Sequence, residues 1–173
     1  MKPSNALLVY TNPTTNEYRK TLDMVEGTLR NCKIKFRLAN RDKLKDAQFR
    51  NDDLVIAVGG DGTFLRAAQF IKSGQLLFGV NADVKNKEGF YMKSDKRDFE
   101  IKIGRILSGH VNIKKFPRLE AYIDNRKIGA LALNEFFVGP KKSYHAAKYV
   151  IEINGVKERQ KSSGILVTTP AGS

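Results

Sequence analysis

Cysteine is almost absent from this sequence, which has only Cys32 among its 173 residues. A single cysteine excludes an internal disulfide framework and favours a reducing compartment such as the cytoplasm. Long apolar runs are also missing, because no window approaches the roughly 18 residues of a membrane-spanning helix. The N-terminus turns polar too early for a signal peptide. We therefore expect a cytoplasmic protein with no membrane partner.

Acidic residues are few relative to basic ones. There are 18 Asp and Glu against 31 Lys and Arg, which gives a formal net charge of +13. A basic surface attracts polyanions. The plainest interpretation is a solvated surface, nucleotide substrates come next, and nucleic acid comes last because the basic residues are scattered and no nucleic-acid motif accompanies them.

The first 105 residues alternate between apolar runs and helical periodicities. The runs predict strands at residues 6–10, 34–38, 54–58 and 76–80. Apolar residues spaced three and four apart predict helices at residues 17–30 and 63–72. This order implies an α/β domain with a right-handed, doubly wound sheet.

The pattern changes near residue 106 to strands separated by short turns. We predict strands at residues 114–122, 127–133, 136–138, 149–153 and 165–169. The pair Asn154-Gly155 between apolar runs is a strong hairpin signal. Residues 106–173 are thus expected to form a mostly β domain, and the pattern stops before that domain is complete. We expect a truncated chain.

A glycine-rich loop, Gly59-Gly60-Asp61-Gly62-Thr63, follows the strand predicted at residues 54–58. Its glycines allow a sharp turn and close approach to a ligand, and a following helix offers N–H groups to phosphate. Asp61 at the tip is able to accept a proton from a hydroxyl nucleophile. The plainer alternative is that Asp61 caps the helix, but Thr63 is itself a good N-cap. The loop has neither the Walker A ending nor the dinucleotide spacing.

Several segments together carry a family resemblance. The pentad resembles the GGDGT signature of a superfamily that includes NAD kinases, lipid kinases and phosphofructokinases. The stretch at residues 79–81 and 89–91, the pair Asn134-Glu135, and the segments at residues 161–164 and 169–173 resemble NAD kinases in order and spacing. The sequence is therefore similar to the NAD kinase family over almost its whole length.

The resemblance implies a fold and a reaction. It implies a Rossmann-like or phosphofructokinase-like domain followed by a sandwich-like β domain. The implied activity is phosphoryl transfer from ATP, or in some members polyphosphate, to the adenosine ribose 2′-hydroxyl of NAD, assisted by a divalent metal, usually Mg²⁺. Members of the family are commonly dimers or tetramers, so a homo-oligomer is expected.

The resemblance also implies roles for particular residues. Asp61 is the implied general base for the 2′-hydroxyl. The residues implied to contact NAD are Gly62, Phe90, Asn134, Glu135, Lys161, Ser163, Thr169 and Ala171. The residues implied to shape the phosphate loop are Gly59, Gly60 and Thr63. No metal ligand is assigned, and His110 and His145 have no metal-ligand spacing.

Each assignment has a plainer structural alternative. Asn134-Glu135 can simply end a strand, Phe90 and Tyr91 can be core or interface aromatics, and Thr169-Pro170 can be an ordinary turn. Many bacterial members have an Asp-Gly pair where this chain has Ser163-Gly164, and serine keeps the hydrogen bond without the charge. For the whole protein, the alternatives are a lipid kinase of the same superfamily or a non-catalytic NAD(P)-binding module.

Overall fold

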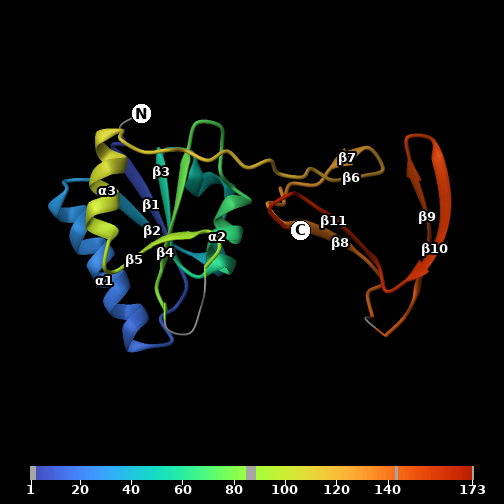
Figure 1. The fold of residues 1–173 in the computed structure, drawn as a ribbon, viewed down its shortest axis with the longest axis horizontal. Coiled ribbons are helices and arrows are strands. Elements are labelled where there is room, and N and C mark those ends of the chain that lie inside the picture. The colour runs from blue at the N-terminus through green and yellow to red at the C-terminus, as the bar shows by residue number, and fades with distance from the viewer. Residues whose placement is uncertain (1–2, 85–88, 143, 173) are drawn as a thin grey trace. The chain divides into compact units, whose positions relative to one another are not determined.

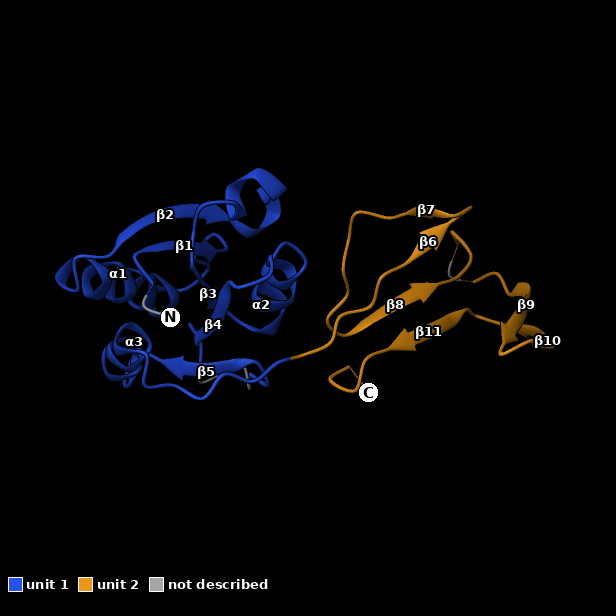
Figure 2. Ribbon diagram, turned by 90° about the horizontal axis from the view of Figure 1, so that it is seen from above, with its two compact units in different colours: residues 1–115 blue, residues 116–173 orange. Residues whose placement is uncertain are grey.

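The computed structural model describes residues 3–84, 89–142 and 144–172. Ser173, the last residue of the predicted third motif, lies outside them. The chain divides into two compact units, unit 1 at residues 1–115 and unit 2 at residues 116–173 (Figure 2). The boundary predicted between residues 105 and 106 falls within helix α3 (Phe99–Ser108).

Unit 1 contains a five-stranded parallel sheet with helices on both faces (Figure 1). Its strands, in the spatial order β2-β1-β3-β4-β5, are β1 (Asn5–Tyr10), β2 (Lys35–Asn40), β3 (Leu54–Gly59), β4 (Leu76–Asn81) and β5 (Met92–Asp95). Helices α1 (Asn16–Asn31) and α3 share a buried cluster with alternate strand residues such as Leu8 and Ile56. Helix α2 (Asp61–Ala68) covers the opposite face (Figure 2). The predicted doubly wound α/β domain is confirmed.

Strand β3 lies in the middle of this sheet, and all six of its residues are buried. Burial on both faces explains why its sequence is an unbroken apolar run. Short 3₁₀ turns η1 (Arg41–Lys43) and η2 (Asp46–Phe49) lie between β2 and β3. No described helix is both long and apolar enough to cross a membrane.

Helix α1 forms close to where its periodicity predicts. The Oγ1 atom of Thr15 accepts the N–H of Tyr18 at 3.1 Å, which caps the first turn. Tyr18, Leu22, Val25 and Leu29, the residues at helical spacing, are buried. The hydroxyl end of Tyr18 reaches the carboxyl ends of the strands, where the glycine loop begins.

Two elements of unit 1, strand β5 and helix α3, were not predicted from the sequence. Strand β5 has the sequence Met-Lys-Ser-Asp, which carries no strand signal, and its pairing with β4 shifts register between Gly79 and Val80. Helix α3 did carry a signal, because Phe99, Ile103 and Ile106 recur at helical spacing and are buried. Helix α2 is shorter than predicted and begins two residues earlier, at Asp61.

The described residues of unit 2 form three two-stranded antiparallel sheets. The pairs are β6 (Tyr122–Ile123) with β7 (Arg126–Lys127), β8 (Glu135–Val138) with β11 (Ile165–Thr168), and β9 (Ala147–Ile153) with β10 (Val156–Ser162). Asn154 and Gly155, with φ values of 51° and 82°, join β9 to β10. Positive φ at both positions is the hairpin geometry that the dipeptide predicts. The mostly β character is confirmed.

The long strands predicted at residues 114–122 and 127–133 are wrong. In these ranges the structure has only the short strands β6 and β7 and one isolated bridge between Leu119 and Ala132. Pro117 has no N–H group to donate, so it interrupts any ladder in the first range.

Candidate functional site

The glycine loop joins strand β3 directly to helix α2. Gly59 has a φ of +155°, and a Cβ atom at this position would lie only 2.5 Å from Oγ1 of Thr63. Gly60 is the N-cap of α2, and its carbonyl oxygen accepts the N–H of Thr63 at 2.8 Å. Thr63 is therefore the third helical residue, buried against the loop, and the prediction that it caps the helix is wrong. Asp61 is the first helical residue and not its cap.

The Asp61 carboxylate is held by the main chain of a distant segment. Its Oδ2 atom accepts the N–H of Phe90 at 2.9 Å, and its Oδ1 atom accepts the N–H of Tyr91 at 3.0 Å. Each carboxylate oxygen has two acceptor positions, so each retains one beyond its amide partner. No local pattern in the sequence links residues that are 29 and 30 positions apart, so these two contacts are not predictable from the sequence.

The two aromatic residues that meet Asp61 occupy different environments. Tyr91 is 4% exposed, and its ring stacks on Phe64 with 4.9 Å between ring centroids. Phe90 is 57% exposed and packs edge-on against Tyr91. The ammonium group of Lys93 lies 5.4 Å from the Phe90 ring centroid. Tyr91 is thus a core residue, whereas Phe90 presents an aromatic surface next to the loop.

A guanidinium group lies close to the same loop. Gly62 is exposed, and a Cβ atom added to it would lie 3.5 Å from Nη1 of Arg41. Arg41 belongs to η1, which follows the carboxyl end of β2. The loop therefore has a positive charge beside it, and in the sequence Arg41 is not distinguished from the other scattered basic residues.

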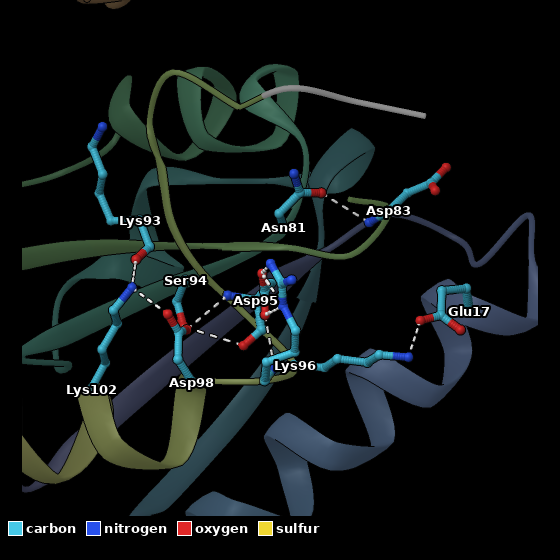
Figure 3. A network of polar contacts seen from close by, with 10 residues as sticks. Glu17, Asn81, Asp83, Lys93, Ser94, Asp95, Lys96, Asp98 and Lys102 are labelled. Atoms are coloured by element: carbon cyan, nitrogen blue, oxygen red, sulfur yellow. Dashed lines mark hydrogen bonds and ion pairs between the residues drawn. The ribbon is translucent and has the colours of Figure 1, made fainter. Parts of the chain in front are cut away.

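A second polar cluster lies at the carboxyl end of β5 (Figure 3). Oδ1 of Asp98 accepts from Ser94 Oγ at 2.7 Å and from the Asp95 N–H at 3.1 Å. Lys102 pairs with the other carboxylate oxygen at 2.6 Å. Burial acts to raise the pKa of Asp98, but the hydrogen bonds from Lys102 and Ser94 outweigh it and hold the pKa below its ordinary value.

This cluster extends to helix α1. Lys96 forms an ion pair with Glu17 in the first turn of α1 (Figure 3). A cavity of about 180 Å³ lies beside this pair, and its lining residues are Glu17, Thr21, Asn81, Ala82, Val84, Asp95, Lys96 and Arg97. Both cations of the lining are already paired, Lys96 with Glu17 and Arg97 with Asp95. The cavity therefore offers an anion little attraction.

In unit 2 the structure brings together Asn134 and the Thr169–Gly172 segment. The N–H of Thr169 donates to the Asn134 carbonyl at 2.8 Å, and its hydroxyl donates to the Leu133 carbonyl at 2.5 Å. The Thr169 hydroxyl also accepts the N–H of Ala171 at 3.1 Å. A Cβ atom on Gly172 would lie 2.5 to 2.7 Å from the Asn134 backbone. Two segments that are 35 positions apart in sequence thus form one tightly packed unit.

The other predicted residues of unit 2 are exposed. Glu135 starts strand β8, Lys161 lies near the end of β10, and Ser163 lies in the turn before β11. In that turn the Ser162 hydroxyl is hydrogen-bonded to Gly164 and to Tyr149, and the Tyr149 hydroxyl also donates to the Gly164 carbonyl at 3.4 Å. Lys161 stands directly opposite Lys148 in the β9–β10 ladder. Their like charges are available to an anionic ligand.

The predicted site residues thus fall into two local groups. Asp61, Gly62 and Phe90 surround the glycine loop of unit 1, and Asn134, Thr169 and Ala171 form the packed cluster of unit 2. Among the residues that the structure describes, no group of three or more His, Cys, Asp or Glu side chains is arranged to hold a metal ion.

Sequence comparison finds similar proteins among curated NAD kinases, although no family model matches the chain. The NAD kinase of Aeromonas salmonicida is 35% identical over 126 residues, which cover 70% of this chain and 42% of that protein. The NAD kinase of Photobacterium profundum is 31% identical over 94% of this chain and 59% of its own length. That of Archaeoglobus fulgidus is 27% identical over 86% and 56%, respectively. The chain therefore spans about half the length of the curated relatives it matches.

Structural comparison gives a consistent result. The crystal structure of yeast NADH kinase complexed with NADH matches with a TM-score of 0.80, at 18% sequence identity. The match covers 98% of this chain and 56% of that one. At this identity the match shows a shared fold. Together with the sequence similarity, it confirms the resemblance to the NAD kinase family.

Proposed function

We propose that this chain, a relative of the NAD kinases, serves in phosphoryl transfer from ATP to the 2′-hydroxyl of the adenosine ribose of NAD. The observation that carries the proposal is the Asp61 carboxylate, fixed at the start of α2 by the Phe90 and Tyr91 amides. The curated relatives support NAD as the acceptor over a lipid.

Asp61 acts in this proposal as the general base. A ribose hydroxyl is a weak nucleophile, and phosphoryl transfer depends mainly on positioning and charge neutralisation. The two amide contacts fix the orientation of the carboxylate and leave an acceptor position on each oxygen for the hydroxyl proton. Gly62 lies against the substrate, and the exposed ring of Phe90 offers a surface on which adenine stacks.

Unit 2 supplies the polar groups that hold NAD. The contacts between Thr169 and residues 133–134 support this role, because they prearrange two motif segments before any ligand binds. Rigid prearrangement lowers the entropy cost of binding. The proposed contacts come from the side chains or main chain of Asn134, Glu135, Lys161, Ser163, Thr169 and Ala171. In unit 1, Gly59, Gly60 and Thr63 shape the phosphate loop.

The proposed cofactor is Mg²⁺. In phosphoryl transfer Mg²⁺ is commonly held by one or two carboxylates together with substrate phosphates and water. Asp61 is assigned as the base in this proposal, so no residue of the chain is assigned as a metal ligand, and the substrate phosphates and water would supply the coordination. When bound, the metal neutralises charge on the transferred group.

Two further parts of the proposal concern the setting of the enzyme. The family resemblance supports a homo-oligomer, a dimer or a tetramer, which light scattering coupled to size exclusion would test. The single cysteine supports a cytoplasmic location.

The direct test is formation of NADP from NAD, ATP and Mg²⁺, comparing the natural chain with Asp61→Asn. We expect kcat to fall about 10²- to 10⁴-fold, the usual contribution of a general base, with KM for NAD little changed. Asparagine keeps an acceptor oxygen for one of the Phe90 and Tyr91 amides and turns its NH2 group towards the other, so the melting temperature should also fall, and kinetics are compared at a temperature where both proteins are folded. Asp23→Asn, on the exposed face of α1, is the matched control.

The outcomes separate the competing functions. Equal losses in kcat and NAD affinity would contradict the general-base role of Asp61. Phosphorylation of diacylglycerol in place of NAD would identify a lipid kinase. Binding of NADP, seen as a raised melting temperature, without NADP formation would identify a non-catalytic binding module.

A further inference from the structure

The hydroxyl of Tyr18 lies buried between two strand ends beside the glycine loop. Its oxygen accepts the N–H of Thr11 at 3.0 Å and donates its proton to the carbonyl oxygen of Val58. Thr11 directly follows β1, and Val58 is the last residue of β3 before Gly59. One side chain of helix α1 therefore connects the ends of the two central strands at the edge where the loop begins.

Tyr18 is built to keep this connection. The residue is only 5% exposed. Burial raises the pKa of its hydroxyl, and the hydrogen bond from Thr11 only partly opposes this effect. The hydroxyl therefore stays protonated through the neutral range, and the donated bond to Val58 persists.

Two glycines separate Val58 from Asp61. Strand pairing holds Gly59 opposite Asn81 of β4, and glycine has more accessible backbone conformations than any other residue, so Gly60 is the position between them that strand pairing leaves unrestrained. Beyond the loop, the Gly60 carbonyl accepts from Thr63, and the Gly59 carbonyl accepts the N–H of Ala82 at 2.9 Å. These contacts join the turn to helix α2 and to the segment after β4. At the end of β3, the Tyr18 hydroxyl would lie 3.4 Å from a Cβ atom at Gly59.

We propose that Tyr18 is a positioning residue for Asp61, whose hydroxyl fixes the Val58–Gly59 peptide and thereby sets where the catalytic loop lies. Tyr18 acts through the main chain and does not touch the reacting atoms. The proposal deepens the NAD kinase function and rests on it for its effect on catalysis. A displacement of about 1 Å at a reacting group reduces catalysis by up to about 10²-fold.

The test compares Tyr18→Phe with Thr21→Val. Phenylalanine keeps the buried ring and removes only the hydroxyl. Thr21 lies one turn further along α1, is 1% exposed, and donates its hydroxyl to the Glu17 carbonyl within the helix. Both variants lose one buried hydroxyl in the same helix, but only Tyr18→Phe loses a bond to the loop strand.

The first measurement is amide hydrogen exchange in the full chain, and it does not depend on activity. Removal of the anchor should speed exchange at Thr63 and Ala82, whose amides donate to the loop carbonyls. We expect an increase of about 10-fold in Tyr18→Phe, since exchange reports local opening, and little change at these amides in Thr21→Val. Equal exchange at Thr63 and Ala82 in the two variants would overturn the proposal.

The second measurement is the kinetics of NADP formation. Tyr18→Phe should lower kcat about 10-fold while KM for NAD changes less than about 2-fold, and Thr21→Val should change neither. Unchanged kcat in Tyr18→Phe, or the same loss in both variants, would remove the positioning role. If the natural chain forms no NADP, the proposed function fails, and the exchange measurement alone decides whether Tyr18 anchors the loop.

Discussion

The two units of the chain stabilise their strands in different ways. In unit 1 all of strand β3 is buried. In unit 2 the apolar residues Val150, Ile153 and Val156 of the β9–β10 hairpin are 58%, 66% and 72% exposed. The buried residues among those described in unit 2 are Ala132, Leu133 and Thr169. Unit 1 is thus organised around an apolar core, whereas the buried residues described in unit 2 lie in or next to its proposed substrate motif.

Removing side-chain volume in the two units should give the largest contrast. Ile56→Ala, in the middle of β3, should lower the free energy of unfolding by about 2–5 kcal/mol, because it leaves a cavity in a fully buried site. Val150→Ala, on the exposed hairpin, should change it by about 0.5 kcal/mol or less. Urea unfolding followed by circular dichroism measures both. Similar losses in the two variants would mean that both units are packed alike.

A substitution that adds a methyl group should show whether the packing of Gly172 against Asn134 in unit 2 is rigid. Gly172→Ala places a methyl group against the Asn134 backbone, which has no freedom to rotate away. We therefore expect the free energy of unfolding to fall by about 1–3 kcal/mol. In Gly129→Ala the new methyl group meets no atom within 4 Å, which makes it the matched control. The readouts are the amide chemical shifts of Thr169 and the affinity for NAD.

The two readouts for Gly172→Ala need to agree. If the shifts at Thr169 move while NAD affinity stays the same, the motif is structural and does not hold the substrate. If neither readout differs from the Gly129→Ala control, the segment at residues 169–172 adapts to the added methyl group. Unit 2 then has no rigidly packed region to compare with its exposed strands.

The smallest effect concerns acid stability, and it belongs to unit 1. The pKa of Asp98 is lowered in the folded chain, so its stabilisation is present above the ordinary aspartate pKa of about 4 and is lost as the pH falls through the folded value. Asp98→Asn should therefore reduce the melting temperature by a few degrees at pH 7 and by less near pH 3. A scan of melting temperature against pH checks this, with Asp23→Asn as the control. An effect that grows towards pH 3 would contradict the assigned direction.

Much of unit 1 was predictable because its local signals and its packing agree. The apolar run at residues 54–58 and the spacing of Tyr18, Leu22 and Val25 indicate elements that the sheet then buries. Strand β5 was not predictable, since its four residues pair with β4 through a register shift that only the assembled sheet defines. The long strands predicted around Pro117 show the opposite failure, because the pairing in that range is limited to the Leu119–Ala132 bridge and the two-residue strands β6 and β7.

The residues of the candidate site could be predicted from the sequence, but the contacts that place them could not. The sequence identifies Asp61 and Asn134 through motif resemblance. It does not reveal that the Phe90 and Tyr91 amides orient Asp61, or that Tyr18 approaches the loop from α1. Each of these contacts joins residues at least 29 positions apart, and no local propensity encodes them.

The β9–β10 hairpin also bears on the order in which the chain folds. Its two strands are joined by only Asn154 and Gly155, so every one of its pairings is local. Such a hairpin forms in about 1–10 μs, whereas the parallel pairing of β1 with β3 must first bring together residues nearly 50 positions apart. The search for distant contacts slows folding. The hairpin that adds little to the final stability is therefore available as one of the earliest structures in the chain, long before Asp61 reaches its place.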